Sequence, residues 1–266
     1  MARDAKKAQK QKAKKDQKRK KKIQADKKQA REFLESNTTE SINAKIDMAL
    51  DLLDKGDPKR AETAVKKIKE KHGDRPYLHF AFGLIASKKG DSDSAIEYFE
   101  NAAEMDENFV EAYVNLARIY SEEIDLKRAA FYLEQVIDLK DKSETLATEA
   151  QEHLEQIKDY CVKEYSLSLE ECIDAQTFFE DGLDSLEEQE LEAAIEKFEA
   201  SLKIKTDSAF VYTNLAMAYA GLGRKAEALE ALKTDLAFDS EDDFAKDLQG
   251  SIEGLADGEL LTFEKF

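Results

Sequence analysis

Apolar residues between positions 109 and 141 recur at helical spacing on two successive faces. The first face is made by Tyr113, Leu116, Ala117 and Tyr120, and the second by Ala129, Leu133 and Val136. Spacings of three and four residues place such positions on one side of an α-helix. The small alanines among them let two helices approach closely. This stretch is therefore predicted to form a helical hairpin.

The same pattern recurs elsewhere in the chain. One hairpin cannot bury its apolar face alone, so copies are expected at a fixed period of about 34 residues. Further frames begin at Ile42, Pro76, Ala175 and Ala209. Each places a small residue in the first helix, and Ala followed by a larger apolar residue in the second. The sets are Ala49, Ala61 and Val65; Gly83, Ala95 and Phe99; Gly182, Ala194 and Phe198; Ala216, Ala228 and Leu232.

These frames resemble the tetratricopeptide repeat, in which an aromatic residue, Leu, a small residue and Tyr precede Ala and then Phe or Leu. The frame at Ala209 matches most fully, with Tyr212, Leu215, Ala216 and Tyr219. The resemblance covers about 42–143 and 175–242. It implies an all-α fold, a tetratricopeptide-type helical-hairpin solenoid of about five repeats, plus an extra central helix and a C-terminal capping helix.

The chain is expected to be organised in five parts. These are a basic arm and hinge at 1–41, disordered or loosely helical; three repeats at 42–143; an extra amphipathic helix and connection at 144–174; two repeats at 175–242; and a capping helix and tail at 243–266. Gly56, Gly90 and Gly223 fall between the helices of a repeat. They are interpreted as helix stops, because glycine readily adopts the left-handed conformation that ends a helix.

Two further helices are predicted outside the repeats. An apolar stripe from Leu146 to Tyr165 predicts a helix over 144–163, and Ser168 and Glu171 have capping-box spacing at the start of the next helix. A terminal helix over 243–256 is expected to turn Phe244, Leu248 and Ile252 inward.

Charge divides the chain into two opposed parts. Residues 1–31 hold 15 Lys and Arg against 3 Asp, a net charge of +12. The remaining residues hold 26 basic and 55 acidic side chains, a net charge of -29, from totals of 41 and 58. The arm and the body should therefore attract each other.

The arm leaves several hypotheses open. It can be a solubilising extension, an arm that folds on the acidic body, or an arm that binds RNA or the ribosome through phosphate contacts. A nuclear import signal would require the run from Lys18 to Lys22. The cations assigned to nucleic-acid binding are Lys6, Lys7, Lys10, Lys12, Lys14, Lys15, Lys18, Arg19, Lys20, Lys21 and Lys22. No aromatic residue is interleaved with them, so such binding would have little sequence preference.

No catalytic, metal or cofactor site is predicted. His72, His79 and His153 lack a second ligand at metal-site spacing, and the carboxylates are spread over nearly every helix face. Cys161 and Cys172 have no CxxC spacing and are expected to be buried thiols in a reducing, cytoplasmic compartment. No apolar run is long enough to cross a membrane. The chain is therefore not expected to be an enzyme.

The resemblance implies that the first helix of each repeat lines a concave groove for a protein or peptide partner. The residues carried over to that groove are Tyr77, Phe80, Leu84, Val114, Asn115, Arg118, Phe179, Leu183, Phe210, Asn214 and Met217. Some members of the family clamp a terminal carboxylate with Lys and Asn. Here Phe80 and Leu84 occupy those places, so an apolar groove is predicted instead. The function inferred is a non-enzymatic adaptor, with the RNA- or ribosome-associated factor as the alternative.

Overall fold

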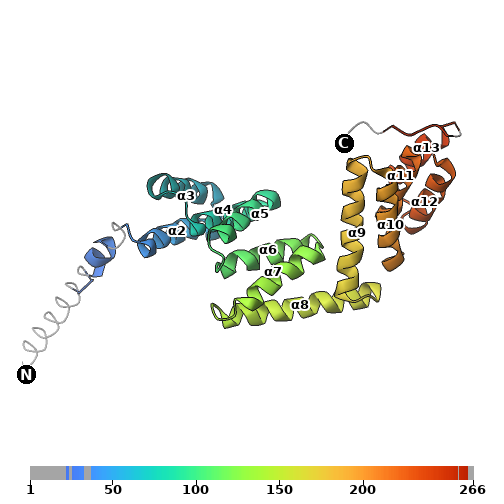
Figure 1. Cartoon of the computed structure of the whole chain (residues 1–266). Helices are drawn as coiled ribbons and strands as arrows, with labels where there is room; N and C mark the ends of the chain where they lie inside the picture. The colour runs from blue at the N-terminus through green and yellow to red at the C-terminus, as the bar shows by residue number, and fades with distance from the viewer. Residues whose placement is uncertain (1–21, 24–25, 33–36, 257, 263–266) are drawn as a thin grey trace, which may run out of the picture. The chain divides into compact units, whose positions relative to one another are not determined.

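The computed structural model describes residues 22–23, 26–32, 37–256 and 258–262, and the regular elements among these residues are α-helices (Figure 1). Of the arm cations named above, Lys22 belongs to the described residues, and those from Lys6 to Lys21 lie outside them. What the arm does therefore stays a prediction.

The helices follow one another as successive pairs, with one unpaired helix between the third and fourth pairs and another after the fifth. In chain order they are α2 (Thr39–Asp54), α3 (Pro58–His72), α4 (Pro76–Lys89), α5 (Ser92–Met105), α6 (Val110–Glu122), α7 (Leu126–Asp138), α8 (Glu144–Tyr165), α9 (Leu169–Glu187), α10 (Leu191–Ile204), α11 (Ala209–Gly221), α12 (Lys225–Phe238) and α13 (Asp243–Glu253). The predicted all-α hairpin fold is confirmed. The unpaired helices α8 and α13 correspond to the extra helix and the capping helix.

Local signals in the sequence account for many of these helix ends. Asp57 and Asp91 accept hydrogen bonds from the backbone N–H groups of Arg60 and Ser94, both at 3.1 Å, and so cap α3 and α5. The capping box of Ser168 and Glu171 is present at the start of α9. The three predicted helix-stop glycines all have positive φ angles, 79° for Gly56, 77° for Gly90 and 72° for Gly223.

The chain divides into two compact units, Met1–Leu116 and Ala117–Phe266, called here the N-terminal and the C-terminal unit. The core of the N-terminal unit is built around Ile42, Ile46, Val65, Leu78 and Ile85. The core of the C-terminal unit runs through α10, α11, α12 and α13 and includes Phe198, Leu215, Leu232, Leu248 and Ile252.

Two hairpins are closed by a phenylalanine that packs directly against a glycine. A Cβ atom on Gly83 would lie 2.5 Å from the ring of Phe99, and a Cβ atom on Gly182 would lie 2.5 Å from the ring of Phe198. Both rings are completely buried. These glycines are therefore required by close helix–helix approach.

The extra helix α8 joins α7 to α9 within the C-terminal unit. It buries Ala147, Ala150, Leu154, Ile157 and Cys161. The predicted stripe is thus confirmed at its centre, while Leu146 and Tyr165 at its ends are partly exposed. Beside α8, α9 also contacts α7 directly, because the backbone N–H of Leu126 donates to Oε1 of Gln176 at 3.1 Å.

Cys161 in α8 and Cys172 in α9 are both buried free thiols, as predicted. Burial, and then a hydrogen bond between the two thiols, raises the pKa of Cys172 to about 12. The thiolate is the reactive form of cysteine, so this environment suppresses its reactivity.

The terminal helix α13 differs from the prediction at one position. Leu248 and Ile252 are buried as expected, but Phe244 is 51% exposed. Ala245 takes the inward place in the first turn instead.

One carboxyl group is buried without a partner. Asp235 in α12 is 0% exposed, and neither of its oxygens has a hydrogen-bond partner among the described residues. Burial, and then the charges of Asp242 and Asp239, raise its pKa from 3.8 to about 6. Ser201 stands 34 residues earlier and donates to the carbonyl oxygen of Ala175 at 2.8 Å. Asp235 thus occupies a repeat position that holds a hydrogen-bond donor in the preceding repeat.

Replacing Gly182 by Ala should destabilise the protein by about 1–3 kcal/mol, because the new methyl group would overlap the Phe198 ring. Gly250 in α13 provides the control, since nothing lies within 4 Å of a Cβ atom built there. Gly250→Ala should be neutral or stabilising by up to about 1 kcal/mol. Urea unfolding of the two variants measures both effects, and equal stabilities would contradict the packing described.

Replacing Asp235 by Asn should raise stability at pH 8 by about 1–3 kcal/mol, because ionised Asp235 is buried and unpaired. A folded-state pKa above the unfolded value means that stability is full below about pH 4 and falls as the pH rises through about 6. The gain from Asp235→Asn should therefore vanish near pH 4. The control is Asp247→Asn, because Asp247 is exposed on α13 and is not among the charges that act on Asp235. It should shift stability by less than about 0.5 kcal/mol. A stability gain from Asp235→Asn that is the same at pH 4 and pH 8 would refute this account.

Candidate functional site

The residues predicted to face a partner come from the first helices of four repeats, α4, α6, α9 and α11. The unit boundary divides them. Tyr77, Phe80, Leu84, Val114 and Asn115 belong to the N-terminal unit, and Arg118, Phe179, Leu183, Phe210, Asn214 and Met217 belong to the C-terminal unit.

In the N-terminal unit an aromatic cluster closes over Phe80. The Phe80 ring centroid lies 5.8 Å from that of Tyr77 and 5.1 Å from that of Phe109. Phe80 is consequently only 8% exposed and acts here as a core side chain. Phe109, which precedes α6, was given no role by the sequence pattern. Its covering position depends on the path of the α5–α6 connection rather than on helical periodicity.

The remaining N-terminal residues are partly exposed. The hydroxyl of Tyr77 donates to a carboxylate oxygen of Asp47 in α2, and burial together with this bond raises the pKa of Tyr77. Leu84 packs at the edge of the core. The Asn115 side chain donates to the carbonyl oxygen of Glu111 at 2.8 Å, within its own helix. The local hydrogen bonds of Tyr77 and Asn115 thus fix the orientation of these side chains.

In the C-terminal unit an exposed aromatic ring stands on the first helix of the last repeat. Phe210 is 64% exposed. Its ring packs edge-on against Phe179 of α9 at a centroid distance of 5.7 Å, and Phe179 in turn lies 6.0 Å from the buried Phe198. Leu183, one turn along α9, packs against the same core. Phe179, Leu183 and Phe210 are called here the first-helix face.

The other predicted residues of this unit do not present free apolar surface. Asn214 and Met217 are buried, and Asn214 donates to the carbonyl oxygen of Phe210 at 2.8 Å. Arg118 is exposed and forms an ion pair with Glu122 at 2.8 Å. Of the predicted groove residues in this unit, Phe210, Phe179 and Leu183 are therefore the apolar ones that remain at least partly exposed.

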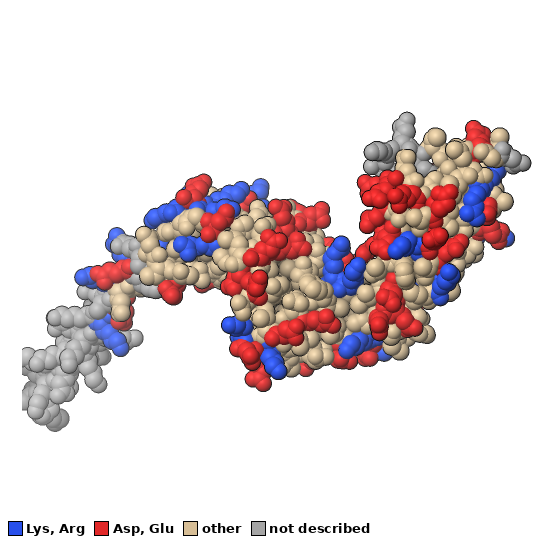
Figure 2. Space-filling view, viewed as in Figure 1, with Lys and Arg blue, Asp and Glu red and all other residues tan. Residues whose placement is uncertain are grey.

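The surroundings of the first-helix face are acidic. Helix α9 carries Glu and Asp side chains but no Lys or Arg. Figure 2 shows acidic side chains gathered on the part of the C-terminal unit where α9 lies. Cations reach α9 from neighbouring helices, with Lys197 pairing with Asp181 at 2.7 Å and Lys127 with Glu180 at 3.8 Å. The apolar residues thus stand beside a surface of negative charge.

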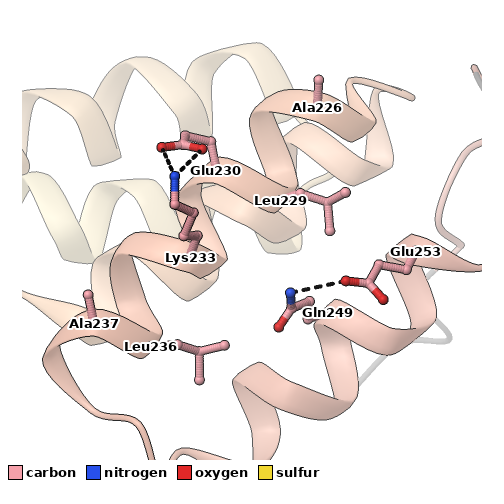
Figure 3. A pocket seen from close by; sticks show the side chains of 8 residues that line it. All are labelled: Ala226, Leu229, Glu230, Lys233, Leu236, Ala237, Gln249 and Glu253. Carbon is pink, nitrogen blue, oxygen red and sulfur yellow. Dashed lines mark hydrogen bonds and ion pairs between the residues drawn. The ribbon is translucent and has the colours of Figure 1, made fainter.

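A pocket of about 440 Å³ lies between α12 and α13 (Figure 3). Gln249 and Glu253 of α13 stand where α11, 34 residues earlier, has Leu215 and Tyr219. In that earlier position the Tyr219 hydroxyl reaches Glu199 at 2.9 Å. Gln249 and Glu253 instead bond to each other at 3.1 Å, beside the Glu230–Lys233 ion pair. The pocket therefore arises because α13 has polar side chains where α11 has large packing ones.

The described residues contain no group of three or more His, Cys, Asp or Glu side chains placed to hold a metal ion. In the same residues, none of the helices combines the length and the apolar character required to cross a membrane.

Comparison with known proteins supports the repeat assignment. Models of the tetratricopeptide repeat match residues 86–154 and 211–238. The first match ends within α8 and the second covers the α11–α12 pair. A search of curated proteins found no match.

Several solved structures align with much of this chain at low sequence identity. The TPR2AB domain of yeast Sti1, in its complex with pHSP90, is 16% identical, with 81% of this chain and 84% of that chain covered and a TM-score of 0.41. A thermophilic TPR protein of Thermus thermophilus is 17% identical, with 80% and 100% covered and a TM-score of 0.33. The protein pilF of Pseudomonas aeruginosa is 17% identical, with 80% and 89% covered and a TM-score of 0.36.

The family assignment rests on the repeats themselves. Both blocks of repeats contain a family match, and the matched segments are built of the helices that the 34-residue pattern predicts. This chain contains tetratricopeptide repeats within residues 86–154 and 211–238.

Proposed function

We propose that this protein is an adaptor that binds an extended or helical segment of a partner protein along the first-helix face of its C-terminal unit. The observation that carries the proposal is the exposure of Phe210, held by Phe179 at 5.7 Å. A solvent-exposed phenylalanine fixed by a second ring offers a rigid apolar contact at little entropic cost.

The setting of Phe210 supports a role in binding rather than in stability. The rest of α11 is almost entirely buried, from Val211 through Ala220, with Tyr212 partly exposed. Phe210 therefore contributes little to the core of its own unit. Its removal from water on binding would supply about 1.5–3 kcal/mol.

The chemistry around this face indicates the kind of segment that fits. An aliphatic or aromatic anchor would pack on Phe210, Phe179 and Leu183. Basic residues beside that anchor would face the acidic side chains of α9. In this unit Phe179 and Leu183 stand where the carboxylate clamp needs Lys and Asn, so the proposed partner is held by apolar contacts rather than by a terminal carboxylate.

The alternative in which residues 1–31 bind RNA or the ribosome stays a prediction, since it falls mainly outside the described residues. Non-enzymatic function and a cytoplasmic location likewise belong to the proposal.

Phe210→Ala should weaken the binding of peptides selected on the full chain from a random displayed library. The expected decrease in affinity is roughly 10- to 150-fold, which corresponds to the apolar surface that the substitution removes. Because Phe210 is exposed, the stability of the variant should stay within about 0.5 kcal/mol of the parent.

The matched control is Phe131→Ala. Phe131 is 53% exposed in the same unit but lies on α7, the second helix of its repeat. Fluorescence anisotropy of the selected peptides compares the two variants. Equal affinities for Phe210→Ala and the parent protein, or an equal decrease in Phe131→Ala, would reject the assigned face.

A further inference from the structure

Helix α3 is basic, whereas residues 32–266 as a whole are acidic. Residues 32–266 hold 26 basic and 55 acidic side chains. Within α3, however, the sequence PKRAETAVKKIKEKH contains more Lys and Arg than Glu. This excess is local, so it requires an explanation beyond the composition of the chain.

The packing of α3 directs these cations to solvent on one side. Ala61 and Val65 are completely buried against the core of the N-terminal unit. At 100° per residue the opposite side of the helix carries Lys59, Arg60, Lys66, Lys67 and Lys71, all of them exposed. Figure 2 shows the basic side chains gathered where α3 lies. We call these five residues the α3 basic face.

The face runs in two rows along the helix. Lys59 and Lys66 form one row, and Arg60, Lys67 and Lys71 form the other, about 100° around the axis. From Lys59 to Lys71 the helix rises about 18 Å. One strand of a B-form duplex presents a phosphate about every 3.4 Å along its axis, so about five phosphates span that length, and an A-form duplex presents slightly more.

Few of these cations are neutralised within the protein. Glu62 pairs with Lys66 at 2.7 Å and with Lys89 at 2.5 Å, and these hydrogen bonds lower the pKa of Glu62 to about 2. Arg60 lies 3.6 Å from Asp57. Within the described part of the chain, Lys59, Lys67 and Lys71 have no carboxylate within ion-pair distance. Glu70 is the one acidic side chain that falls between the two rows.

The positive field continues past the end of α3. The pKa of His72 is lowered first by burial and then by the charges of Lys45, Lys71 and Arg75. Lys45 comes from α2 and Arg75 from the connection to α4. Cations from three segments therefore act on the same corner of the N-terminal unit.

We infer that the α3 basic face binds the phosphate backbone of double-stranded RNA. Phosphates are favoured over protein carboxylates because a duplex concentrates charge and releases condensed counterions on binding, which a folded acidic surface does not. An A-form duplex packs its phosphates more densely along its axis than a B-form duplex, and its narrow major groove is not read by side chains. The α3 basic face fits that mode, since it has two rows of cations and no aromatic side chain to stack on bases.

The test compares two triple variants of the full chain against a double-stranded RNA of mixed sequence. One is Lys59→Gln, Lys67→Gln and Lys71→Gln. The matched control is Lys140→Gln, Lys142→Gln and Lys163→Gln, which removes the same charge from exposed positions in the C-terminal unit. The basic arm is identical in both, so its contribution cancels.

The slope of log affinity against log salt concentration, measured by anisotropy, should become shallower by about 2–3 in the α3 variant, because each phosphate that is no longer neutralised lowers the slope by about 0.7–0.9. It should be unchanged in the control. Binding of the Phe210-dependent peptides should survive in both variants, which separates this result from the adaptor proposal.

Three outcomes would overturn the inference. Equal slopes in the two triple variants would mean that the α3 basic face makes no local contact. Double-stranded DNA that binds as tightly as the RNA would reject the A-form assignment. Displacement of the RNA by poly-L-glutamate at equal charge concentration would reassign the face to an acidic protein.

Discussion

The close approach of the two helices within each repeat is the constraint on which the rest of this structure depends. Gly83 and Gly182 admit the rings of Phe99 and Phe198 to a distance at which no Cβ atom could fit. In the other three repeats alanine stands in the place of this glycine, and Val or Leu stands in the place of the phenylalanine. The residues at these positions, all of them buried, are Ala49 and Val65, Ala117 and Leu133, and Ala216 and Leu232. A smaller side chain on one helix is thus matched by a larger one on the other, as a close-packed interior requires.

This constraint explains how much of the fold could be predicted from the sequence. Small and large residues repeating every 34 positions identify the hairpins, and helix-stop glycines and capping residues place many of their ends. The predicted helix over 144–163 is observed as Glu144–Tyr165. Three turns were not predicted, because Ile124, Ser166 and Gln189 adopt positive φ angles of 60°, 58° and 62° without being glycine. A β-branched residue in that region is costly, so no local rule would have placed Ile124 there.

The candidate site was harder to predict, for a physical reason. Periodicity indicates which side of a helix a residue occupies. It does not indicate whether a connecting segment or a neighbouring repeat covers that residue. Phe80 was expected to be exposed and is covered by Phe109, whereas Phe210 at the same kind of helix face is open. Asn214 bonds to its own backbone and Met217 belongs to the core. The difference between these residues depends on contacts remote in sequence, which pattern analysis does not contain.

In the C-terminal unit, some repeat positions that hold packing residues in one repeat hold polar residues in the next, and this changes how the core is filled there. Gln249 and Glu253 replace the packing pair Leu215 and Tyr219, which leaves a pocket rather than a filled interface between α12 and α13. Asp235 stands at the repeat position where the preceding repeat has the buried hydrogen-bond donor Ser201. It remains in the core although its carboxyl group has no hydrogen-bond partner among the described residues. A buried group of this kind is tolerated only if the surrounding packing offsets its desolvation. Helix α11 packs against α12 and is buried along nearly all of its length, so its apolar side chains contribute to that packing while Phe210 faces solvent.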